Sequence, residues 1–338
     1  MAEPSSRIGA TVAVKRTIQH GGSIDIVTLG NSRAEDGLDH ELLRSTALKR
    51  GFRHLPATLR GAHWVTWVEL SDWIEREHGA TSNALIAVSV ADLFWATNGA
   101  HEIGMIEPLR KGLIPDQDAR QLFDRHEPET YGVWSSLLAY RADFADYVHD
   151  PMERHDVLAE TRISPASIDG KTLSDICRIP TTSIADCAGH TPEELSQIGI
   201  VKECRDTLPL LAQREDWTES GAGVHEGERS RLLALRQRQL SGLPYRRPLV
   251  VLMPVLKMWR HDVFPNGYEK WVEQVLGPLV ASGRISLIDA TTFFDTRDAA
   301  ECTAFVDLYH QNQLAAEELT KALLPRIDEL LYQQDSSP

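Results

Sequence analysis

A serine near the start of the chain and a histidine and an aspartate near its end have the side chains needed for acyl-transfer chemistry. Ser32 lies in Leu29-Gly30-Asn31-Ser32-Arg33, and Asp307 and His310 are three positions apart. A serine hydroxyl becomes a nucleophile when a histidine removes its proton, and a carboxylate usually orients that histidine. The spacing of Asp307 and His310 can place both side chains on one side of a turn. If the two segments meet, Ser32 would be the nucleophile, His310 the base and Asp307 the orienting carboxylate.

Each segment taken alone also has a purely structural interpretation. Gly30-Asn31-Ser32 is ordinary turn chemistry, in which Ser32 would cap the following helix. Asp307 could likewise cap a helix beside a surface histidine. The structural interpretation is favoured for either segment by itself, and only their combination favours catalysis.

Alternating apolar runs and amphipathic stretches predict the elements that would position these side chains. Strands are expected at Ile24–Leu29, Ala84–Val90, Pro248–Met253 and Ile285–Ile288, and helices at Leu38–Lys49, Trp64–Glu77, Tyr268–Ala281 and Gln311–Leu331. Strands that alternate with helices predict an α/β fold, a three-layer α/β/α sandwich with a mainly parallel sheet. Ser32 would follow the carboxyl end of the first strand, where ligands gather in such sheets.

The stretch between the two α/β halves has a different pattern. Residues 99–245 show helical segments and polar loops without a convincing strand pair. We therefore expect one domain over residues 1–338, with a core at about 20–98 and 246–332 and a helical insertion at about 99–245. Within the insertion, Glu215–Arg229 is rich in glycine and charge and predicts a loop.

Composition and charge exclude several classes of function. The formal net charge of −14 disfavours a nucleic-acid partner, because phosphate binding needs a basic surface. No apolar stretch is long enough to span a bilayer, and the first residues lack a signal-peptide pattern. The chain as written is expected in the cytoplasm, or in the periplasm if an N-terminal signal or anchor has been trimmed from it.

The cysteines give little evidence of a metal site or a disulfide scaffold. Cys177, Cys187, His190 and Cys204 could supply four zinc ligands but lack the paired close spacings of common zinc modules. A disulfide or plain buried thiols are the favoured alternatives. We expect no metal and no cofactor.

The two chemical segments together resemble the SGNH/GDSL hydrolase superfamily. Its first block is Gly-Asp-Ser after the first strand, and its last is Asp-x-x-His before the C-terminal helix. The run Asp25–Arg33 with Gly37-Leu38 looks like the branch that includes bacterial alginate and cellulose acetylation proteins. The ending of that branch is matched by Asp307, His310, Asn312 and Thr320. The resemblance covers residues 24–98 and 248–330.

The resemblance implies further site residues. The superfamily builds its oxyanion hole from the backbone N–H of the nucleophile, a second-block glycine and a third-block asparagine, here Ser32, Gly61 and Asn98. The third-block pattern Gly-x-Asn-Asp is absent. Val88–Phe94 stands in its place, Asn31 replaces the first-block aspartate, and Asn98-Gly99 also suits a turn. Substrate contacts are expected from Arg33, Trp95 and Trp259, the two tryptophans because each follows a predicted strand.

The resemblance implies a serine esterase or O-acyltransferase that works through an acyl-Ser32 intermediate. The expected substrate is an acyl ester, with acetyl groups on a bacterial exopolysaccharide such as cellulose preferred, and other exopolysaccharide-synthesis proteins are possible partners. Two alternatives stay open. One is a non-catalytic SGNH-like protein that binds polysaccharide or assists its synthesis. The other is a lipid esterase or thioesterase.

Overall fold

The structure is a computed structural model, and it describes most of the two α/β halves of the chain. The described residues are 7–21, 23–79, 83–94, 226–255, 268–295, 304–305 and 310–332, together with Ile106 and Leu109.

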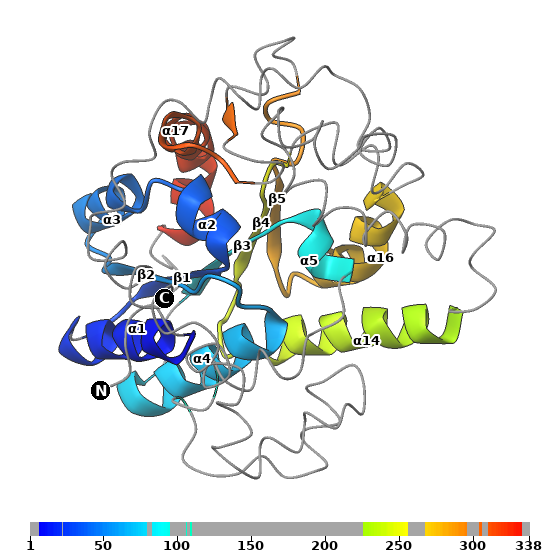
Figure 1. Ribbon diagram of the computed structural model, residues 1–338, viewed down its shortest axis with the longest axis horizontal. Helices are drawn as coiled ribbons and strands as arrows, with labels where there is room; N and C mark the ends of the chain where they lie inside the picture. The colour runs from blue at the N-terminus through cyan, green and yellow to red at the C-terminus, as the bar shows by residue number, and fades with distance from the viewer. Residues whose placement is uncertain are drawn as a thin grey trace, which may run out of the picture.

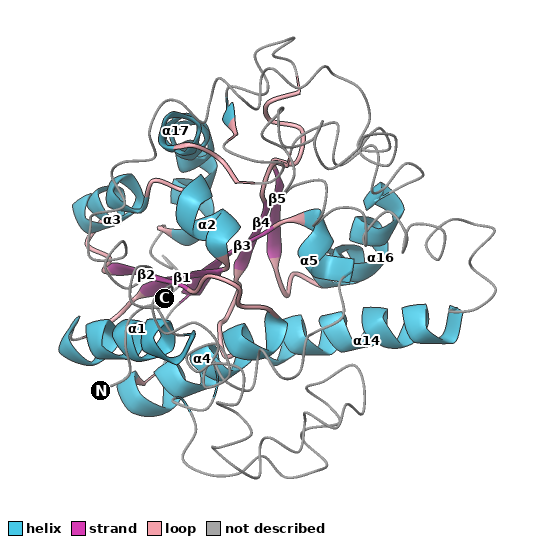
Figure 2. Cartoon of the chain, in the orientation of Figure 1, coloured by secondary structure: helices cyan, strands magenta, loops and turns pink. Residues whose placement is uncertain are grey.

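A five-stranded parallel sheet forms the centre of the protein (Figure 2). Its strands are β1 (Ile26–Gly30), β2 (His54–Thr58), β3 (Asn83–Val88), β4 (Leu249–Leu252) and β5 (Ser286–Asp289). The strand order is β2-β1-β3-β4-β5, and every pair of neighbours is parallel. Because the strands are parallel, their carboxyl ends all reach the same edge of the sheet. The order changes direction between β1 and β3, and that switch point is where ligands bind in open α/β sheets.

Helices cover both faces of the sheet (Figure 1). They are α1 (Arg7–Gly21), α2 (Ser32–Gly37), α3 (His40–Lys49), α4 (Trp64–His78), α5 (Val90–Phe94), α14 (Glu226–Gly242), α16 (Tyr268–Ala281) and α17 (Gln313–Leu331). In the view of Figure 1, α2, α3 and α17 lie above the sheet and α1, α4 and α14 lie below it. The α/β prediction is confirmed.

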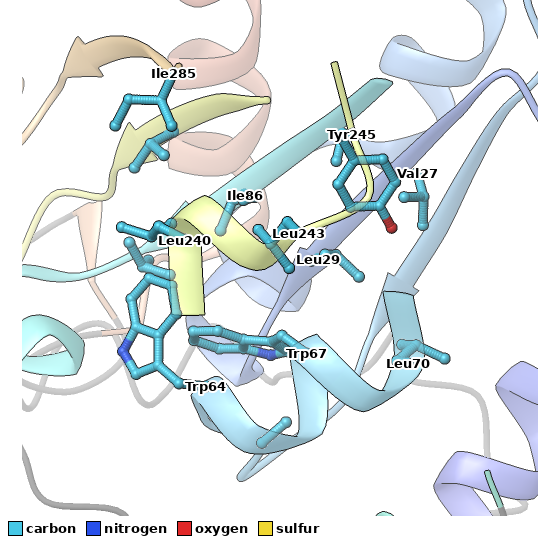
Figure 3. Close-up of a cluster of buried hydrophobic side chains, with 14 of the residues drawn as sticks. Val27, Leu29, Trp64, Trp67, Leu70, Ile86, Leu240, Leu243, Tyr245 and Ile285 are labelled. Atoms are coloured by element: carbon cyan, nitrogen blue, oxygen red, sulfur yellow. The ribbon is translucent and has the colours of Figure 1, made fainter. Parts of the chain in front are cut away.

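Alternate residues of the strands feed two separate hydrophobic cores. Val27 and Leu29 of β1 pack with the first core, whereas Ile26 packs with the second. The first core contains the tryptophans of α4, the end of α14 and the residues that follow it, as Figure 3 shows for Trp64, Trp67, Leu240, Leu243 and Tyr245. The second core lies under α3 and α17. A strand buried on both faces has an apolar side chain at almost every position, which is why the central strands are continuous apolar runs in the sequence.

Two elements differ from the sequence expectation. The strand β2 was not predicted, because it contains Pro56, which cannot donate a ladder hydrogen bond and argues against a strand in the sequence; its place at an edge of the sheet accommodates this residue. The predicted loop Glu215–Arg229 overlaps α14, which begins at Glu226. This helix packs against α4 and α16 and contributes to the first core. Most of residues 99–225 lie outside the described residues, so the bounds of the predicted insertion stay a prediction.

Candidate active site

The turn that carries Ser32 is fitted tightly between β1 and α2. A Cβ atom on Gly30 would lie 2.3 Å from Ala34 Cβ and 2.6 Å from the Ala87 carbonyl oxygen, so the close approach requires glycine. Asn31 caps α2, because its Oδ1 accepts a hydrogen bond from Arg33 N at 3.1 Å. Ser32 is thus the first residue of α2, and the predicted capping role belongs to its neighbour Asn31.

The structure brings His310 against Ser32. Nε2 of His310 lies 2.8 Å from Oγ of Ser32, although the two residues are 278 positions apart. The contact is partly buried. At this separation the imidazole can take the hydroxyl proton, which is the relation that an activated serine nucleophile needs.

The chain on the C-terminal side of His310 is fixed at two points. Nε2 of Gln311 donates to the Pro254 carbonyl oxygen at 2.5 Å, which ties the segment to the end of β4. Asn312 caps α17, because its Oδ1 accepts from Ala315 N at 3.0 Å. His310 therefore stands directly before a segment that is anchored both to the end of β4 and to the start of α17.

Gly37 and Thr320 also bring the two distant segments together. A Cβ atom on Gly37 would lie 2.4 Å from Oε1 of Gln311 and 2.6 Å from Cε of Met253, so α2 closes directly over the histidine segment. Oγ1 of Thr320 accepts a hydrogen bond from Asp39 N at 2.8 Å, which joins α17 to the start of α3. These contacts give a packing reason for glycine at 37 and threonine at 320.

The other predicted site residues are placed differently or not described. Asp307, Asn98, Trp95 and Trp259 lie outside the described residues. Gly61 lies in the turn after β2 with φ 73°, a conformation that favours glycine. Just before it, Leu59 N donates to the Gly30 carbonyl oxygen at 2.9 Å, so this turn is joined to the end of β1.

Arg33 does not extend into solvent as a substrate ligand would. Its Nη1 donates to Oδ1 of Asp92 at 2.8 Å, and the exposed fractions of the two side chains are 6% and 0%. Asp92 stands four residues beyond β3, within the stretch Val88–Phe94 that replaces the third-block pattern. The acidic residue beyond the carboxyl end of a strand was the available signal for this site, but the sequence alone does not show which residue it contacts.

The ionisation of Asp92 follows from its surroundings. Burial raises the pKa of the carboxyl group, but the Arg33 guanidinium, the nearby His63 and hydrogen bonds from Ser89 outweigh burial and hold the pKa below its ordinary value. Burial also lowers the pKa of His63. Asp92 is therefore a buried carboxylate that stays ionised.

A second charged group lies beside the serine–histidine pair. Glu35 follows Ser32 by one turn of α2 and interacts electrostatically with His310. Burial raises the pKa of Glu35, and the Arg60 guanidinium, whose Nε lies 3.3 Å from Glu35, only partly offsets this. Arg60 also pairs with Asp36.

Comparison with family models, curated proteins and solved structures finds no match for this chain. Across the residues that the structure describes, no group of histidine, cysteine, aspartate and glutamate side chains could hold a metal ion. The described helices also include none that is long and apolar enough to cross a membrane. Functional inference therefore rests on the geometry around Ser32.

Proposed function

We propose that the protein is a serine-dependent acyl-ester hydrolase or O-acyltransferase. The observation that supports this proposal is the 2.8 Å separation of His310 Nε2 from Ser32 Oγ. Its position adds support, because Ser32 directly follows β1 at the switch point of the sheet. The SGNH-like pattern of the two chemical segments points to the same chemistry.

The proposed reaction has two steps. His310 takes the proton of the Ser32 hydroxyl as Oγ attacks the acyl carbon, and the alcohol then departs with that proton, leaving acyl-Ser32. Water or a sugar hydroxyl next loses a proton to His310 and attacks the acyl carbon. The bond from that carbon to Oγ then breaks, and His310 returns the proton to Oγ, which restores the Ser32 hydroxyl. The Ser32 N–H is one of the first-turn donors of α2, which have no acceptor within a helix, and in this proposal it binds the oxyanion. Asp307 is proposed to orient His310.

The preferred acyl group is acetyl, and the preferred substrate is an acetylated bacterial exopolysaccharide such as cellulose. This choice follows from the resemblance of residues 25–33 and 307–320 to proteins of polysaccharide acetylation. The triad serves hydrolysis and transfer equally, since the acceptor is selected by what the site admits.

A fluorophosphonate probe tests the proposal, because it modifies only an activated serine. We expect the wild-type protein to be labelled, and Ser32→Ala and His310→Ala to lose labelling. Ser45→Ala is a matched control, since Ser45 lies exposed on α3 and its hydroxyl only donates to the Leu42 carbonyl oxygen. Labelling of Ser32→Ala at the wild-type rate would refute the proposal.

Acyl selectivity and the acceptor are separate measurements. Release of 4-nitrophenol from the acetyl ester is expected to exceed release from long-chain esters. A preference for long chains would instead favour a lipid esterase. Addition of cello-oligosaccharides should divert acetyl groups to sugar if the protein is a transferase, and only acetate should form if it is a hydrolase.

A further inference from the structure

The Asp92 carboxylate receives four hydrogen bonds at the carboxyl edge of the sheet. Oδ1 accepts from Asn31 Nδ2 at 2.9 Å and from Arg33 Nη1 at 2.8 Å. Oδ2 accepts from Ser89 N at 2.7 Å and from Ser89 Oγ at 2.9 Å. The side chain is fully buried. Asp92, Asn31, Arg33 and Ser89, here named the Asp92 cluster, thus bridge the ends of β1 and β3.

The cluster holds the residues on both sides of Ser32. Asn31 and Arg33 immediately flank the serine, and both donate to the same carboxylate oxygen. Fixing both neighbours restricts the backbone of the residue between them. The Ser32 hydroxyl meets His310 instead, so the cluster sets the direction from which Oγ approaches the imidazole.

The cluster also gives a physical reason for asparagine at position 31. An aspartate there would place a second carboxylate against Oδ1 of Asp92, at the position where Nδ2 now lies 2.9 Å away. Two carboxylates at that distance cannot both stay ionised without a large cost. Asparagine supplies the donor that Asp92 needs, while its own Oδ1 still caps α2.

We propose that Asp92 is a positioning residue for the nucleophile, acting through Asn31 and Arg33, and that its carboxylate is the reason for asparagine at position 31. This inference rests on the proposed role of Ser32. Asp92 contacts Asn31, Arg33 and Ser89, so its effect on the reaction is exerted through the geometry of the nucleophile. A small displacement of a reacting group lowers the rate far more than it lowers substrate affinity.

An exchange of the two side chains tests the proposal. Asn31→Asp sets two carboxylates against each other, and Asp92→Asn removes the charge that Arg33 contacts. Each is expected to lower kcat for 4-nitrophenyl acetate on the order of 10²-fold. KM should change by no more than about twofold, since only the reacting geometry is altered. The double variant Asn31→Asp/Asp92→Asn restores one amide facing one carboxylate and should recover about tenfold of the lost kcat.

A control separates positioning from general loss of stability. Oη of Tyr332 lies 2.9 Å from His54 Nδ1, and His54 begins β2 at the amino end of the strands, away from Ser32. Tyr332→Phe removes that buried contact, so it should lower Tm and leave kcat unchanged. If Asp92→Asn does not fold, Asn31→Ser replaces it, because serine still caps α2 but lacks the amide donor to Asp92.

The results have distinct meanings. Wild-type kcat in Asn31→Asp, or losses of kcat that follow Tm equally in the cluster variants and in Tyr332→Phe, would overturn the positioning role. Failure of the double variant to recover any activity would also contradict it. These outcomes leave the proposed function intact as long as Ser32→Ala abolishes labelling, whereas unchanged labelling of Ser32→Ala refutes the function itself.

Discussion

Removal of the Arg33 guanidinium tests the energetics of the Asp92 cluster. Arg33→Met keeps much of the side-chain volume but leaves Asp92 buried without its ion-pair partner. Breaking a buried pair in this way costs about 3–5 kcal/mol of unfolding free energy. The matched control is Arg44→Met, because Arg44 pairs with Glu41 on the surface and both side chains are exposed. Such a surface pair contributes about 0–1 kcal/mol.

The loss of unfolding free energy in Arg33→Met, here called its deficit, should depend on pH. In the wild type the folded-state pKa of Asp92 lies below its ordinary value of 3.8, so its contribution to stability is present above pH 3.8 and is lost as the pH falls through the lower folded value. Arg33 is the largest of the influences that oppose burial, so its removal is expected to raise the folded-state pKa of Asp92 above that of the wild type. The deficit of the variant is then full at neutral pH and shrinks as acid protonates Asp92.

Urea unfolding of both proteins at neutral and mildly acidic pH, followed by tryptophan fluorescence, measures this difference. A deficit below about 1 kcal/mol at neutral pH would place Arg33→Met in the range of a surface pair. A deficit that stays constant with pH would show that Asp92 is not the group left uncompensated. Either result would refute the electrostatic reasoning.

Two further predictions concern the sheet. Gly30→Ala forces a Cβ atom to within 2.6 Å of the Ala87 carbonyl oxygen. The variant should lose about 1–3 kcal/mol of unfolding free energy in urea, and fluorophosphonate should label it more slowly. Wild-type values of both would contradict the close approach of α2. Burial, and to a lesser extent the nearby His40, lowers the pKa of His54 to about 3. The folded state therefore favours neutral His54, and this contribution to stability is present above pH 6.5 and is lost as the pH falls toward 3. The stability of His54→Gln should therefore decline less than that of the wild type over this range, and parallel pH profiles would contradict the assignment.

The central strands could be predicted because burial on both faces makes them continuous apolar runs. Val250 and Ile86 belong to such runs and lie fully or almost fully buried in the first core. The edge strand β2 could not be found in the same way, since one side of an edge strand tolerates Pro56 and polar residues. The start of α14 was taken for a loop because its first turn consists of charged residues and Gly227.

The site was predictable only where local sequence carries the signal. Ser32 and His310 lie in short motifs, and the structure places them in contact. The role of Arg33 was different, because a charged residue beside a nucleophile suggests a substrate ligand until its partner is known. That partner, Asp92, is 59 residues away in the chain, and only the adjacency of β1 and β3 brings the two together.

Identification of the acylated residue is the most direct test of the proposed mechanism. The protein would be mixed with 4-nitrophenyl acetate, quenched in acid and digested with trypsin, and the peptide Thr17–Arg33 would be sequenced by mass spectrometry. We predict an acetyl group on Ser32 that forms during turnover and is absent from Ser32→Ala. Ester consumption with no acetyl group on Ser32, or with the acetyl group on another residue, would contradict the acyl-Ser32 mechanism.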